Sequence, residues 1–230
     1  MELSDRLENN IILGNLKIIK QELNDSLEKL IDIDIQRYLI RTAIRHHKYD
    51  ISEYLIDHFN FDMDTQAGYN YTLLMSFIEE IHGTTLEQIQ YIVDKTKNIN
   101  LMDYARETAL DKTMTPGTKI NNQIIEDVIV ILLERGSNVL LPHYRDSFLA
   151  YIVESNNYNI LTLILKHSKI NIIADAFILA VKFDNYDFAE LLVNTVDIGD
   201  ITIDGLNLLQ YVRQTEQPNA DIIELIESAM

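Results

Sequence analysis

A recurring unit about 33 residues long is the feature of this chain that most restricts its fold. Each unit contains a short polar turn followed by an eight-residue stretch rich in apolar side chains. Seven such stretches begin at Leu16, Tyr49, Leu86, Glu126, Tyr158, Tyr186 and Ala220, at successive steps of 33, 37, 40, 32, 28 and 34 residues. A period in this range, with insertions tolerated between units, is typical of helical repeats that stack and bury a core between neighbours.

The seven stretches share an apolar stripe when they are aligned. Apolar side chains dominate the third, sixth and seventh positions, which lie on one face of a helix because they are three or four residues apart. The eighth position widens the stripe. In the fifth stretch, for example, these positions are Ile160, Leu163, Ile164 and Leu165. The alignment therefore predicts seven amphipathic helices that pack through this face.

A second apolar segment precedes most of these stretches and is predicted to be a partner helix. The segments are 38–46, 73–81, 148–154, 176–183 and 208–212. Short turns such as Asn156-Asn157 and Asp184-Asn185 join the pairs, and Asn and Asp suit both tight turns and helix caps. The longest insertion, 113–123, contains Pro116-Gly117, which indicates a loop.

Breaks in the stripe occur at both ends of the chain. Gln21 and Glu22 interrupt it in the first stretch, and Glu227 interrupts it in the last. The outermost units of a stacked array need a polar outer face. We therefore expect one repeat domain over residues 1–230, with polar capping repeats at both ends.

Composition limits the kind of partner and compartment. The chain of 230 residues has a formal net charge of −17, has no cysteine and is 47% hydrophobic. Nucleic acid is a poor partner for such a chain, because binding there relies on Lys and Arg at phosphates. No apolar run is long enough to span a membrane. We expect a monomer in the cytoplasm, either of the producing cell or, for an effector, of a host cell.

The negative charge is concentrated toward the end of the chain. Residues 1–60 carry eight Lys or Arg against eleven Asp or Glu, whereas residues 171–230 carry two against eleven, a net charge of −9. One interpretation is a solvated surface that keeps the protein soluble. The other is an acidic face that attracts a protein with a basic surface.

Several stretches resemble ankyrin repeats. Residues 126–139 end in Leu132-Leu133-Glu134-Arg135-Gly136-Ser137-Asn138-Val139, which is similar to the second helix and exit turn of that family. Thr108-Ala109-Leu110-Asp111 is similar to its Thr-Pro-Leu-His helix opening, and looser copies begin at Thr72, Ser147 and Asn207. Asp204-Gly205 stands where the family has its hairpin turn. The resemblance implies an all-α, ankyrin-like solenoid of about seven stacked helix pairs.

The hairpins, or fingers, between the repeats depart most from the family. No helix opening has the proline, and the turn glycine is replaced by Asn70, Arg106, Arg145 and Ile173. That glycine supplies a positive φ, which bulky side chains adopt at a cost. We therefore expect irregular fingers. Chains that diverge in this way are similar to ankyrin proteins of large DNA viruses, intracellular bacteria and bacterial self-protection systems.

The sequence lacks recognisable catalytic, nucleotide-binding and metal-binding motifs. It has no phosphate-binding loop, no His-Glu-x-x-His pair and no Gly-x-Ser-x-Gly elbow, and Asp62-x-Asp64 lacks the other ligands of a calcium loop. We expect no catalytic residue, no cofactor and no metal site, and hence a protein that is not an enzyme. An enzyme whose site leaves no mark in the sequence is the alternative of a different class.

Aromatic and basic side chains gather in the predicted fingers. Exposed Tyr and Arg are typical of residues that dominate protein–protein binding energy, although tyrosines can also stack between neighbouring fingers. The candidate protein-binding residues are Tyr69, Tyr71, Met102, Tyr104, Arg106, His143, Tyr144 and Arg145. Residues 103–106 and 143–146 are one repeat apart, so Tyr104, Arg106, Tyr144 and Arg145 are predicted to form one patch.

The sequence thus predicts a non-enzymatic module that binds or sequesters another protein through its concave and finger surface. A pathogen effector that modulates a host is one interpretation. A bacterial immunity or inhibitor protein, whose acidic surface meets a basic partner, is the alternative. The sequence does not identify the partner.

Overall fold

The protein is mostly helical in the computed structural model, as predicted. The structure describes residues 3–25, 32–113, 123–138, 152, 157–167, 170–215 and 219–230. The chain divides into two compact units, residues 1–112 and 113–230, which are treated separately below. The single-domain interpretation and its polar capping repeats stay predictions.

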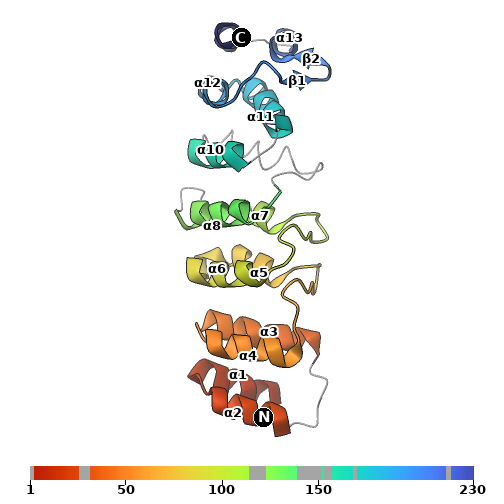
Figure 1. The fold of residues 1–230 in the computed structure, drawn as a ribbon, viewed down its shortest axis with the longest axis vertical. Helices are drawn as coiled ribbons and strands as arrows, with labels where there is room; N and C mark the ends of the chain where they lie inside the picture. Colours follow the sequence, from red (N-terminus) through yellow and green to blue (C-terminus); the bar gives the residue numbers. More distant parts are fainter. Residues whose placement is uncertain are drawn as a thin grey trace. The chain divides into compact units, whose positions relative to one another are not determined.

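The first unit is built from helix pairs. The pairs are α1 (Leu3–Leu13) with α2 (Leu16–Asp25), α3 (Ile33–Arg45) with α4 (Tyr49–Phe59), and α5 (Leu73–Glu79) with α6 (Leu86–Lys95). A short 3-10 helix, η1 (Ile81–Gly83), precedes α6, and α7 (Ala109–Lys112) packs on α5. Within this unit the pairs lie one above the next (Figure 1).

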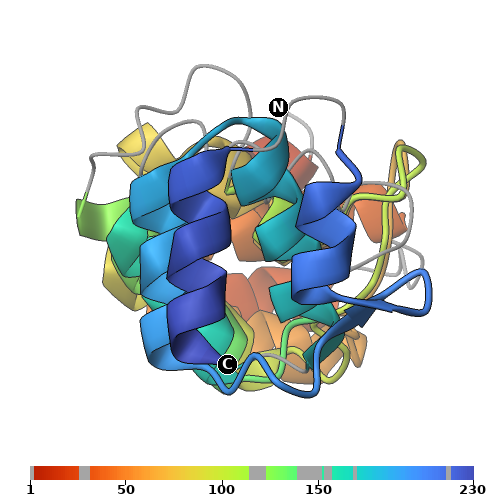
Figure 2. The ribbon, with the colours of Figure 1, turned by 90° about the horizontal axis from the view of Figure 1, so that it is seen from above.

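The second unit contains α8 (Gln123–Glu134), α10 (Tyr158–His167), α11 (Ile170–Lys182), α12 (Tyr186–Thr195), α13 (Leu208–Arg213) and α14 (Ala220–Ala229). Among its described residues, these helices form two pairs, α11 with α12 and α13 with α14. Strands β1 (Thr202–Ile203) and β2 (Leu206–Asn207) form an antiparallel hairpin before α13. Figure 2 looks down on the last pair of this unit and shows α14 beside α13, with the hairpin at the outer edge.

Local capping explains where many helices begin. Six of the seven predicted stretches begin at the first residue of a helix, and α8 begins three residues before the predicted Glu126. Thr85 and Gln88 form a reciprocal capping box at α6, and Asn185 accepts a hydrogen bond from the Phe188 amide at α12. Such caps satisfy amides that have no partner inside the helix, so the polar turns set the helix starts.

The buried face of these helices differs from the predicted stripe. The third and seventh positions are buried in six of the seven helices, as expected, but the sixth is only partly buried or exposed in all of them. The fourth position is buried instead in six of the seven helices, as in Ile89, Ile129, Leu161 and Ala189. Positions 4 and 6 flank the stripe on opposite sides, and the neighbouring helices cover the side of position 4. In α2, Ile19 and Leu23 are buried, whereas Ile18 is 44% exposed.

The partner helices also differ from the prediction in places. The turn predicted at Ile173 is wrong, because this residue lies inside α11, which begins six residues before the predicted Ala176. Helical hydrogen bonding there is compatible with its apolar, glycine-free sequence. Arg145 and all of segment 148–154 except Ile152 lie outside the described residues.

Candidate protein-binding surface

Two fingers of the first unit have left-handed turns despite lacking the expected glycine. In the 67–71 finger, the amide and carbonyl groups of Ala67 and Tyr71 exchange hydrogen bonds of 3.0 Å, and Tyr69 and Asn70 have φ values of 37° and 60°. In the 103–107 finger, the Asp103 amide donates to the Glu107 carbonyl over 3.0 Å. Arg106 has a φ of 64° there. Asn tolerates this conformation well, whereas Arg adopts it at a cost.

The two fingers are joined to each other. The Tyr104 amide donates a hydrogen bond of 3.0 Å to the Tyr69 carbonyl. The Gln66 side-chain amide donates to the carbonyls of Asn70 and Met102, both over 2.7 Å. One glutamine therefore bonds to both fingers, and the two turns lie side by side.

Arg37 of α3 anchors the 67–71 finger from below. Its guanidinium donates to the carbonyls of Thr65 and Tyr71 over 3.3 and 2.5 Å. Burial lowers the pKa of Arg37, with Arg41 adding to the effect. Since arginine stays protonated even so, its charge-assisted bonds fix the end of the finger at Tyr71, and the segment before the finger at Thr65, to α3.

Lys112 of α7 anchors the 103–107 finger through a buried cluster of charges. Its side chain is 6% exposed, and its ammonium group lies 2.7 Å from Asp103 Oδ2 and 2.5 Å from Glu107 Oε2. It also donates to the Tyr71 hydroxyl over 2.8 Å. Burial by itself would lower the pKa of Lys112, but hydrogen bonds to Asp103, Glu107 and Tyr71 outweigh it and raise the pKa.

The same lysine links the two fingers a second time. Tyr71 belongs to the 67–71 finger, and its hydroxyl donates to Glu79 Oε1 over 2.6 Å while it accepts from Lys112. Burial raises the pKa of Tyr71, so this hydroxyl stays neutral. Tyr71 is thus held inside the support of the fingers rather than presented at their surface.

The remaining predicted residues of these fingers face solvent. Tyr69 is 78% exposed, Tyr104 is 71% exposed and Met102 is 37% exposed, and Arg106 is exposed as well. We call Tyr69, Met102, Tyr104 and Arg106 the paired-finger surface. His143, Tyr144 and Arg145 lie outside the described residues, so their pairing with Tyr104 stays a prediction.

Sequence reasoning missed the side chains that hold this surface in place. Arg37, Gln66 and Lys112 were not among the candidates. A signal existed for Lys112, because it directly follows the Thr108-Ala109-Leu110-Asp111 helix opening, at a position that faces the core. A buried lysine requires carboxylate partners, and Asp103 and Glu107 precede it by nine and five residues.

A groove lies beside the hairpin of the second unit. It has a volume of about 660 Å³ and is lined by α11, the hairpin and α13, including Val181, Leu206 and Tyr211. Lys182 and Asp204 stand among its polar residues. Apolar walls with a few polar groups are typical of surfaces that receive a ligand or a partner's side chain.

Metal-ligand clusters and membrane-spanning helices are both missing from the described part of the chain. Over these residues, no group of three His, Cys, Asp or Glu side chains is arranged to hold a metal ion. None of the helices described is long and apolar enough to cross a membrane.

Comparisons with known proteins do not assign this chain to a class. No protein-family model matches the chain, and no curated protein matches it.

Proposed function

We propose that this chain is a non-enzymatic, ankyrin-like repeat protein that binds another protein through the paired-finger surface. One observation carries the proposal: two tyrosines, each more than two thirds exposed, project from neighbouring turns that are fixed to each other and to the helices. Exposed aromatic side chains that are grouped together mark an interaction surface, whereas exposed apolar residues scattered singly do not.

Rigid support strengthens this proposal. A binding residue that is held in place before the partner arrives loses less conformational entropy on binding. Arg37 and Gln66 bond to backbone carbonyls of the fingers, and Lys112 pairs with the Asp103 carboxylate at the base of the second finger. The backbone that carries Tyr69 and Tyr104 is thus supported before a partner arrives. Tyrosine then contributes a large apolar area together with a polar hydroxyl.

The ankyrin-like class is supported by local geometry at the helix openings. In all three openings that begin at Thr72, Thr108 and Asn207, the first side chain accepts a hydrogen bond from the amide three residues later. The turn positions Asn70, Arg106 and Gly205 all have positive φ. A finger followed by a capped helix therefore recurs with the same geometry in both units.

The proposed partner is a protein with a basic surface, met in the cytoplasm of the producing or host cell. The net charge of −17 favours such a partner through long-range attraction. A pathogen effector that sequesters a host protein fits this role, and so does an immunity or inhibitor protein. We propose that the chain acts as a monomer and needs no cofactor.

Comparative capture from an extract of the producing cell tests the proposal. The immobilised wild-type chain is compared with Tyr69→Ala/Tyr104→Ala and with Tyr38→Ala, a control that removes an exposed tyrosine from α3. A protein held by the wild type and the control but lost from the double variant supports the proposal. If the double variant keeps every protein that the wild type retains, the paired-finger surface is not the interface.

A further inference from the structure

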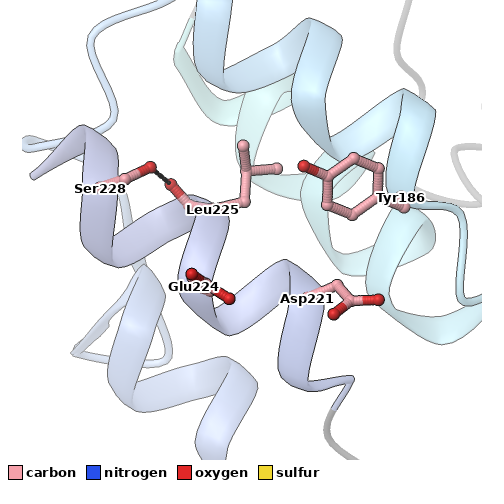
Figure 3. Close-up of a pocket in the computed structure, with 5 residues that line it drawn as sticks. All are labelled: Tyr186, Asp221, Glu224, Leu225 and Ser228. Carbon is pink, nitrogen blue, oxygen red and sulfur yellow. Dashed lines mark hydrogen bonds between the residues drawn. The ribbon is translucent and has the colours of Figure 1, made fainter.

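A groove between α12 and α14 of the second unit has the chemistry of a site for a basic side chain. It has a volume of about 440 Å³ and is lined by Tyr186 of α12 and by Asp221, Glu224, Leu225 and Ser228 of α14. The four α14 residues follow a spacing of three, one and three, so they lie on one face of that helix. Figure 3 shows the Tyr186 ring across from Leu225 and Asp221.

Tyr186 forms an aromatic wall that is open to solvent. Tyr186 is 36% exposed, while Phe188 and Ala189 behind it are fully buried. The rear of α12 is therefore fixed in the core. The face of an electron-rich phenol ring attracts a cation placed over it.

Two carboxylates complete the groove. Asp221 and Glu224 are both exposed, and neither forms an ion pair with another described residue. Glu227 on the same helix pairs with Arg213, so it is already neutralised. The Ser228 hydroxyl donates to the Leu225 carbonyl over 2.7 Å and is occupied within the helix (Figure 3).

The surrounding charge favours the same kind of ligand. Residues 171–230 have a net charge of −9, and Lys182 and Arg213 are their only cations. A groove with unpaired carboxylates in such a field attracts positive groups and repels acidic ones. The groove of the same unit beside the hairpin contains Lys182, so the two grooves differ in charge.

We propose that this groove binds an arginine side chain from a basic segment of another protein. The planar guanidinium stacks on the Tyr186 ring, and its N–H groups donate to the carboxylates of Asp221 and Glu224. Leu225 contacts the methylene stem. The proposal rests on the proposed function only in that the ligand belongs to a protein partner, since the groove and the paired-finger surface use different units.

The test measures binding of a fluorescent peptide by anisotropy at low salt. The probe is a capped peptide with four arginines separated by alanines, and its counterpart has citrulline, a neutral isostere, in place of each arginine. The full-length chain is compared with Asp221→Asn/Glu224→Gln and with Asp50→Asn/Asp57→Asn. The second variant removes the same charge from exposed positions on α4 and is the matched control.

We expect the groove variant to weaken binding of the arginine peptide at least about fivefold, with less than about a twofold change in the control. Tyr186→Leu should weaken it about threefold, whereas Tyr186→Phe keeps the ring and should bind as the wild type does. The citrulline peptide should not bind. Circular dichroism checks that each variant keeps its helices.

Equal losses in the groove and control variants would overturn the proposal, because they would mean diffuse attraction by net charge. Equal binding by Tyr186→Leu and Tyr186→Phe would overturn the stacking. The double variant Tyr69→Ala/Tyr104→Ala separates the two proposals. Its affinity for the arginine peptide should be unchanged, even if its capture of a protein partner is lost.

Discussion

The backbone amide of Tyr104 donates a hydrogen bond to the backbone carbonyl of Tyr69 over 3.0 Å. This bond joins two fingers that are one repeat apart in the chain and places two exposed rings on neighbouring turns. Because the bond uses only backbone groups, replacing either side chain leaves it in place. The rings can therefore be removed while their support stays intact.

This separation allows a sharp test of the paired-finger surface. Once a partner is identified, Tyr69→Ala and Tyr104→Ala together should reduce the free energy of binding by at least about 2 kcal/mol, the scale of residues that dominate an interface. The melting temperature should stay the same, because both side chains are solvent-exposed. Titration calorimetry of the two single variants and the double variant measures their coupling. An unchanged affinity would place the interface elsewhere.

The charge cluster at Lys112 should matter for folding rather than for direct contact with a partner. Lys112→Met leaves the carboxylate of Asp103, whose side chain is 2% exposed, without its cation. We expect a loss of roughly 3 kcal/mol in the free energy of unfolding, as for other broken buried pairs. Urea denaturation measures it.

A second substitution serves as the control for this prediction. Lys112→Met/Asp103→Asn removes both charges, and Asn can still accept the bond that Asp103 Oδ1 receives from the Glu107 amide. Its stability should lie above that of Lys112→Met. A double variant that is less stable than the single one would contradict an uncompensated charge as the cause.

The carboxyl of Asp111 should make stability depend on pH. Burial raises the pKa of Asp111, outweighing the bonds that its carboxylate accepts from Thr108. The folded state then holds this proton more tightly than the unfolded state does. The resulting contribution to stability is complete below the unfolded pKa of about 3.9 and is lost as the pH rises through the folded pKa.

Asp111→Asn isolates this effect, because the amide cannot ionise and its oxygen can accept the same bonds. The variant should gain stability relative to the wild type as the pH is raised from 3 to 7. Urea denaturation at both pH values checks the sign. A difference between the two proteins that is independent of pH would show that Asp111 titrates alike in both states.

The corrected buried face of the repeated helices predicts a contrast between adjacent residues. Leu132, Ile164 and Leu192 are fully buried at the seventh position, so each mutation to Ala should cost roughly 2–5 kcal/mol. Leu163 and Leu191 at the sixth position are only half-buried and should cost about 1 kcal/mol. Chemical denaturation of the five variants compares them. Equal losses at Leu163 and Ile164 would restore the predicted stripe.

Backbone strain predicts that substitutions at two equivalent turns change stability differently. Gly205 has a φ of 79° and open space around the position of an added Cβ, so Gly205→Ala should cost about 1 kcal/mol from conformation alone. Arg106 already bears that cost at a φ of 64°. Arg106→Gly should therefore not destabilise the fold, as thermal unfolding can show. A large loss would mean that the Arg106 side chain has a structural role.

Local chemistry made part of this fold predictable. At the two turns singled out in the sequence, Asn157 caps α10 and Asn185 caps α12, because a cap depends on residues within one turn of each other. The third and seventh positions were correctly assigned to the core for a similar reason, since they are four residues apart on any helix. The same local rule could not decide between positions 4 and 6, as both border the stripe.

Tertiary contacts decided the rest of the candidate site. Tyr69 and Tyr71 look equivalent in the sequence, yet a hairpin turns one ring to solvent and directs the other hydroxyl to Glu79 and Lys112. The sequence by itself determined the helix period and the starts of six of the seven repeated helices, because these depend on neighbouring residues. Only the tertiary structure paired Tyr69 with Tyr104 and brought Tyr71 and Glu79 to Lys112, because those contacts join residues from different repeats.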